Sequence, residues 1–241
     1  MNGNNPAAAG RTPWFLRPSF IRVSPFALFM GFVAVQEGLR CTAAIVPAES
    51  ETLMPLLFTG RGMAAGFLLF LFRGEYTEIN WREVGETGKG CASVLTGILV
   101  FVLWIALDGG WGTYGVVRGF DPGIFPDVAG RWSMIFFRTA GMGLVVPVME
   151  ELFWRSFLAR WLLDSDFQRV PVGRFTKSSF IFSAVLFGLE HNMVAAGIVA
   201  GILYNLLLRL TGSISCCIAA HALTNSMLCV YILINGTYHL W

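Results

Sequence analysis

The stretch Ser213–Ile234, SISCCIAAHALTNSMLCVYILI, contains no Asp, Glu, Lys or Arg along its whole length. A helix needs ~20 residues to cross the hydrocarbon core of a bilayer, so this stretch is long enough for one crossing. Similar runs recur along the chain. They are continuous, whereas the strands of a membrane barrel alternate between apolar and polar positions. The sequence therefore predicts an all-α, polytopic transmembrane helical bundle.

The composition of the 241-residue chain agrees with this fold class. Charged residues make up 13% of the chain, against about 25% in soluble domains, and the hydrophobic types reach 55%. The net charge is only +2, and the five cysteines show no CxxC spacing. These values exclude a disordered chain, a soluble basic nucleic-acid-binding protein and a disulfide-stapled secreted module. We expect the lipid bilayer as a partner and no nucleic acid.

We predict about seven spans, within a range of six to eight, and place the active-site helices in the C-terminal half. The fourth span ends at Met149, which puts Glu150 near the cytoplasmic boundary. The loop 108-131 is expected to lie outside the membrane. The candidate spans are Val23–Val35, Leu53–Phe72, Cys91–Leu107, Trp132–Met149, Ser178–Leu189, Met193–Leu208 and Ser213–Ile234.

Basic residues predict the orientation, because Lys and Arg collect on the cytoplasmic side of membrane proteins. We expect the N-terminus in the cytoplasm and the C-terminus outside. Arg138 then falls within the fourth span. The outer segments hold four basic residues, Arg40, Arg61, Arg118 and Arg131. The inner segments hold twelve, namely Arg11, Arg17, Arg22, Arg73, Arg82, Lys89, Arg155, Arg160, Arg169, Arg174, Lys177 and Arg209.

Ionisable residues inside membrane helices are few, and each costs about +2.5 to +3.5 kcal/mol on insertion scales. Glu150 and Glu151 are adjacent, so on a helix their carboxylates diverge by about 100° and favour unequal roles. Glu151 and Arg155 are four residues apart and can pair. Glu150 then faces a cavity, where it can act as a general base on water. The alternative is an ordinary helix end with solvated charges.

Two further polar motifs follow. Phe187 precedes His191 by one helical turn and can shield its imidazole. His221 and Asn225 are also one turn apart, so their donors can converge on one oxyanion. The alternative for such residues is an interhelical hydrogen bond, which is the role we assign to Asn205. Glu190 receives no role and is expected to point toward the loop.

The ordered motifs EExxxR, FxxxH and HxxxN over Glu150–Asn225 resemble the CPBP family of intramembrane metalloprotease-like proteins, which includes CAAX prenyl endopeptidases and Abi proteins. The resemblance implies an endopeptidase that cleaves a membrane-associated protein or peptide near the membrane surface. By motif position, Glu150 activates water and His191 assists it. His221 and Asn225 stabilise the oxyanion, while three residues have supporting roles: Glu151, Arg155 and Phe187.

A fainter resemblance upstream links the chain to CAAX-protease-related proteins of bacterial exosortase systems and implies the bacterial inner membrane. It is carried by Arg22–Phe26, Tyr76–Ile79 and Trp104–Asp108. The resemblances divide the chain into a polar tail (1-20), N-terminal transmembrane helices with an external loop (21-131) and a CPBP-type catalytic core (132-241).

No metal or other cofactor is expected, because the chain lacks the helical HExxH motif. The first alternative is a zinc peptidase that binds the metal through Glu150, His191 and His221. The second alternative is a non-enzymatic membrane scaffold or immunity protein. The oligomeric state stays open.

Overall fold

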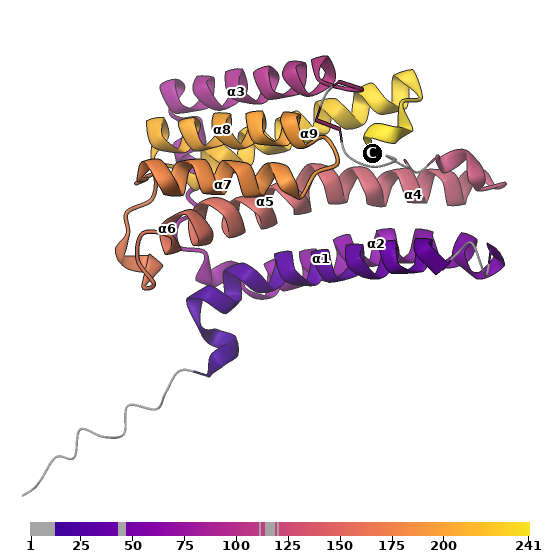
Figure 1. The fold of residues 1–241 in the computed structure, drawn as a ribbon, viewed down its shortest axis with the longest axis horizontal. Helices are drawn as coiled ribbons and strands as arrows, with labels where there is room; N and C mark the ends of the chain where they lie inside the picture. Colours follow the sequence, from indigo (N-terminus) through magenta and orange to yellow (C-terminus); the bar gives the residue numbers. More distant parts are fainter. Residues whose placement is uncertain (1–12, 43–46, 111, 114–118, 120) are drawn as a thin grey trace, which may run out of the picture.

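The computed structural model describes residues 13–241 except 43–46, 111, 114–118 and 120 (Figure 1). Most of the predicted tail 1-20 and part of the loop 108-131 lie outside the described residues. The described residues form helices and contain no strand beyond one bridge between Thr113 and Met193. The helices are α1 (Pro18–Thr42), α2 (Pro47–Leu71), α3 (Thr87–Ala106), α4 (Val128–Ala140), α5 (Val146–Glu151), α6 (Ala159–Trp161), α7 (Lys177–Leu189), α8 (Val194–Thr211) and α9 (Ile214–Asn235).

Five of the helical segments described are long and apolar enough to cross a membrane, and two shorter apolar helices accompany them. This confirms the predicted polytopic helical bundle, and all seven candidate spans fall on helices. The long segments are Pro18–Arg40, Thr87–Ala106, Val128–Trp161, Val194–Thr211 and Ile214–Asn235, and the shorter ones are Leu56–Leu71 and Lys177–Leu189.

The fourth span is longer than predicted. Helices α4, α5 and α6 form one segment of 34 residues, Val128–Trp161, rather than ending at Met149. Glu150 therefore lies inside the helix, about 16 Å along the axis from Trp161, and not at a helix end as the predicted span implied. The physical reason is that the paired charges beyond Glu150 are buried in the bundle instead of marking its edge.

Two wide, π-helical turns interrupt this long helix. The first, Gly141–Val145, comes just before Pro147, which has no N–H for the carbonyl four residues earlier and collides with it. The second, Leu152–Leu158, follows α5 directly. The sequence predicted ordinary α-helical geometry through Glu150–Arg155, and the structure replaces its second half with a wide turn.

The helices pack in two groups joined by the long helix. Helices α1 and α2 lie side by side, and α4–α6 runs between this pair and α3, α7, α8 and α9 (Figure 1). Glycines allow close approaches between helices, since a Cβ at Gly201 would lie 2.9 Å from the backbone of Ala184, and one at Gly97 2.7 Å from the carbonyl of Ala220. Small residues at helix contacts are typical of membrane bundles. They bring α7 against α8 and α3 against α9.

The prediction of the orientation counted Arg61 among the basic residues outside the membrane spans, but the structure places it within a helix. It lies within α2 and its Nη1 donates to Gln36 Oε1 at 3.0 Å. Its guanidinium also lies 4.9 Å from the ring centroid of Phe29 and 4.6 Å from that of Phe58. The aromatic faces offset part of the cost of a buried cation, which is why an arginine persists inside this helix.

An ion pair at the start of α1 connects three parts of the chain. Arg22 donates to Glu78 at 2.6 Å, and Ser156 donates to the same carboxylate. Burial raises the pKa of Glu78, but the hydrogen bonds and charge of Arg22 outweigh that effect and leave the pKa below its usual value. The pair thus fixes the loop after α2 against α1 and the long helix.

We expect Glu78→Gln to lower the melting temperature of the detergent-solubilised protein by about 5–10 °C at pH 7, because removal of one partner of a buried pair costs about 3 kcal/mol. A carboxylate with a depressed pKa stabilises the fold above its unfolded pKa of about 4.3, and this contribution is lost as the pH falls through the folded value. The difference between variant and wild type should therefore shrink below about pH 4. A difference that is constant with pH would contradict the ion-pair interpretation.

Candidate active site

Four predicted residues from three distant motifs line one cavity of about 200 Å³, namely Glu150, His191, His221 and Asn225. Glu150 comes from α5, His191 from the turn after α7, and the other two from α9. Phe187 lines the same cavity. The rest of the wall is mainly apolar and aromatic, so the polar groups meet in a cavity of low polarity.

The two adjacent carboxylates diverge, as their spacing predicted. Glu150 lines the cavity, whereas Glu151 is fully buried beside it and accepts from Arg155 Nη1 at 3.2 Å. The predicted pair of Glu151 and Arg155 is thus present. One oxygen of Glu150, Oε2, has no hydrogen-bond partner among the described residues. An unpartnered, buried carboxylate oxygen beside a cavity is available to a ligand or to a water molecule.

Glu151 also holds His221. The Nδ1 of His221 lies 3.0 Å from Glu151 Oε1, so Nδ1 carries a proton and donates it to the carboxylate. The Nε2 of His221 faces the other carboxylate, 3.9 Å from Glu150 Oε2. Tyr204 stacks on the imidazole with 5.0 Å between ring centroids. Carboxylate and ring together fix the orientation of the imidazole, and Tyr204 was not predicted as a contributor.

Arg155 is buried behind these groups. Its Nε donates to Asn205 Oδ1 at 3.3 Å, and its guanidinium lies 4.3 Å from the ring centroid of Phe187. Asn205 in turn donates to Ser183 Oγ at 2.9 Å. The prediction of an interhelical hydrogen bond for Asn205 is confirmed, and this bond also orients the arginine.

His191 has one nitrogen committed to the backbone. Its Nδ1 lies 2.8 Å from the carbonyl oxygen of Phe187, which can only accept, so Nδ1 carries the proton. In the neutral ring Nε2 then keeps its lone pair. The rings of Phe187 and Trp104 contact the imidazole, with centroids 5.0 and 5.3 Å away. The predicted shielding by Phe187 is present, and Trp104 adds to it.

The expectation that Glu190 points toward the loop is wrong. Its side chain turns into the bundle, is 10% exposed and accepts from Trp154 Nε1 at 3.0 Å. Ligand atoms of Glu150, Glu190 and His191 all lie within 4.8 Å of one another. The tryptophan N–H one helix away provides the partner that turns the carboxylate inward, and the motif spacing of the sequence contains no signal for that contact.

Asn225 is oriented by the long helix. Its Nδ2 donates to the carbonyl of Met142 at 2.9 Å, and Met142 belongs to the first wide turn. An amide group carries a second N–H in addition to the one that Met142 accepts. His221 and Asn225 therefore line one cavity, but each is already held by a different partner.

Residues 132–227 match the family model described as type II CAAX prenyl endopeptidase Rce1-like. The matched segment contains all three motifs, and the match confirms the resemblance they suggested. The match covers 96 of the 241 residues and is a similarity to that family over this part of the chain. No curated protein and no solved structure matches the chain.

Proposed function

We propose that the protein is an intramembrane endopeptidase that hydrolyses a peptide bond of a membrane-associated protein or peptide with Glu150 as the general base. One observation carries the proposal: Glu150, His191, His221 and Asn225, which come from three distant motifs, line a single cavity of about 200 Å³. A membrane helix bears the cost of such polar groups where they bind or transform a ligand.

Attack on the substrate begins at Glu150. The carboxylate accepts a proton from a water molecule as the water oxygen bonds to the scissile carbonyl carbon. His191 assists through Nε2, which accepts a hydrogen bond from the same water because Nδ1 is committed to Phe187. Both groups must reach one water, and one ring nitrogen of His191 lies within 4.8 Å of a carboxylate oxygen of Glu150.

The attack forms a tetrahedral intermediate with a negatively charged oxygen, the oxyanion. Its breakdown requires stabilisation of this oxyanion and a proton for the departing amine nitrogen. The oxyanion accepts from Nε2–H of His221, which carries a proton on both ring nitrogens in this step, and from the second N–H of Asn225. Glu151, held by Arg155, stabilises the positive charge on His221. Glu150 then returns its proton to the departing nitrogen as the C–N bond breaks, which yields a new carboxylate and a new amine.

The membrane setting completes the proposal. The apolar helices and the family match support an integral membrane protein. We place residues 132-241 as the catalytic core and 21-131 as its support, in a bacterial inner membrane with the N-terminus in the cytoplasm.

The direct test uses the protein reconstituted in lipid nanodiscs with a pool of single-span membrane proteins as substrates. Mass spectrometry should detect fragments with new N- and C-termini and, in H₂¹⁸O, one ¹⁸O in each new carboxylate. A pool that stays intact over many hours, with folded protein present, would count against the peptidase.

A metal-dependent mechanism is the alternative that a specific observation favours. The atoms of Glu150, Glu190 and His191 form a set of potential ligands, in which Glu190 replaces the His221 of the sequence-based alternative. Their spread of up to 4.8 Å exceeds the ~3.4 Å edge of a tetrahedral zinc site, so the set would have to contract on binding. Two carboxylates and one imidazole are otherwise suitable zinc ligands.

We expect peptidase activity to survive exhaustive treatment with EDTA and 1,10-phenanthroline, because Glu150 can activate water without a metal. Elemental analysis of the treated, active protein should give much less than one metal ion per chain. Activity that is lost on chelation and restored by Zn²⁺ would replace the metal-free mechanism with the zinc mechanism.

A further inference from the structure

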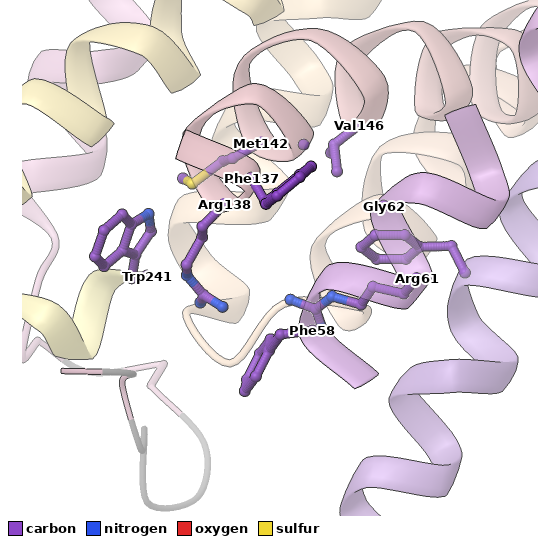
Figure 2. Close-up of a pocket in the computed structure, with 10 residues that line it drawn as sticks. Phe58, Arg61, Gly62, Phe137, Arg138, Met142, Val146 and Trp241 are labelled. Carbon is purple, nitrogen blue, oxygen red and sulfur yellow. The ribbon is translucent and has the colours of Figure 1, made fainter. Parts of the chain in front are cut away.

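Trp241 lies between two cavities of the bundle. It lines the Glu150 cavity and also a second cavity of about 100 Å³, which lies between α2 and the first wide turn of the long helix. Met142 and Val146 of the long helix line both cavities as well. In Figure 2, which shows the second cavity, Trp241 enters from the segment after α9 and Met142 from the long helix. The three side chains therefore form a partition between the two spaces.

Contacts from different parts of the chain hold the indole of Trp241. Gly236 ends α9 with a φ of 67°, a conformation that favours glycine, and the chain continues into a 3₁₀ turn, Tyr238–Leu240. Trp241 follows this turn directly. Its ring stacks with Tyr238 at 5.8 Å between centroids, and the guanidinium carbon of Arg138 lies 5.3 Å from the ring centroid. The indole thus has a defined position in the cavity wall.

The size and polarity of the Glu150 cavity suit one apolar side chain. Besides the four polar groups proposed for catalysis, its wall is mainly apolar and includes Leu228, Leu240 and Trp241. An apolar cavity of about 150 Å³ is enough to bind benzene. The Glu150 cavity, with about 200 Å³, therefore admits a side chain of that size next to a scissile bond.

The second cavity is the space that a larger side chain would enter. Aromatic residues such as Phe58 and Phe137 line it, together with Arg61 and Arg138. An aromatic side chain can pack against such rings and against the face of a guanidinium group. With the indole of Trp241 in place, the partition separates this space from the Glu150 cavity. A smaller side chain at position 241 should join the two spaces.

We propose that Trp241 is a specificity-determining residue, whose indole closes the Glu150 cavity and sets the largest side chain that a substrate places beside the scissile bond. This assignment rests on the proposed function. A substrate Leu or Phe fits between the catalytic groups and the indole, whereas a substrate Trp collides with it. Overfilling of a packed site displaces its neighbours and weakens binding. The specificity then comes from outside the three motifs and outside the segment 132–227 that matches the family model.

The experiment measures binding without cleavage. Glu150→Gln protein in phosphatidylcholine nanodiscs is incubated with a pool of Ala-based decapeptides in which one position, varied along the peptide, carries Leu, Phe or Trp. Captured peptides are counted by mass spectrometry, and capture by empty nanodiscs is subtracted. We expect the Leu and Phe peptides to exceed their Trp matches about 10-fold, within the range that one methylene group produces in a hydrophobic pocket.

Adding Trp241→Ala should remove this preference, and adding Trp241→Phe should reduce it, because the smaller ring leaves part of the partition. Trp132→Ala is the matched control: Trp132 is 63% exposed on the long helix, so the preference should persist. If Trp241 only stabilised the fold, its replacement would lower the melting temperature and the capture of all peptides alike, without changing their ratio. Trp241→Phe keeps an aromatic ring beside Tyr238, so it carries the test if Trp241→Ala does not fold.

A ratio that is the same in the Trp241 variants and in the Trp132 control overturns the proposal, and so does the absence of any preference in the Glu150→Gln protein. Cleavage of the same peptides by protein with Glu150 intact separates the two proposals. If no peptide is cleaved but the ratio of captured peptides changes with Trp241, the peptidase is wrong and the size limit stands. If peptides are cleaved with the same preference in wild type and in Trp241→Ala, only the size limit is wrong.

Discussion

Replacement of Glu150 by Gln should abolish peptide cleavage, with a loss of at least about 10³-fold in kcat, because the amide cannot accept a proton from water. Gln has nearly the same shape, and the unpartnered Oε2 of Glu150 makes no hydrogen bond among the described residues that the change would break. The variant should therefore keep its melting temperature. Cleavage by reconstituted protein, quantified by mass spectrometry, measures the effect.

Two variants sharpen this test. Glu86→Gln changes an exposed carboxylate at the start of α3 and should retain full activity. Glu150→Asp keeps the carboxylate but withdraws it from the cavity, so it should retain a small, measurable rate. Wild-type activity in Glu150→Gln would instead favour a non-enzymatic scaffold whose polar cluster serves packing.

Loss of the His221 imidazole should lower kcat by about 10²–10³-fold, the usual effect of removing one oxyanion donor. Because the donor acts on charge that develops in the transition state, KM should change little in His221→Ala. Glu151 and Arg155 remain paired in this variant, which preserves the buried charges. Steady-state kinetics with a peptide found in the cleavage screen supplies both constants.

The control for His221→Ala is His239→Gln. His239 lies outside the cavity, is 44% exposed on its side chain and contacts Asp108 at 2.8 Å. It should retain wild-type kcat. A rise in KM with unchanged kcat in His221→Ala would show that the imidazole binds substrate and has no special role in the transition state.

Much of the fold follows from the sequence, for reasons that individual segments make plain. Ser213–Ile234 is continuous and nearly uncharged, so its helix and its length are dictated by the bilayer. The divergence of Glu150 and Glu151 and the pairing with Arg155 follow from helical geometry alone. These features depend on neighbours in the sequence, and the structure has each of them.

Features that depend on contacts between helices could not be predicted. The inward turn of Glu190 requires the N–H of Trp154, and the stack of Tyr204 on His221 requires α8 to lie against α9. The length of the fourth span was underestimated because Glu151 and Arg155 suggested a helix end, whereas their burial depends on partners such as Asn205. Sequence spacing contains no information about such partners.

The two wide turns on either side of α5 have a consequence for the comparison of this chain with similar sequences. Each wide turn contains one residue more than a regular α-helical turn. The direction in which Glu150 points relative to α4 therefore depends on this extra residue and does not follow from the number of residues between them. A relative that lost or gained a residue there could keep the same span and yet rotate its acidic motif by about 100°. Alignments of such relatives should therefore be anchored on the acidic motif itself, with gaps admitted inside the membrane helix.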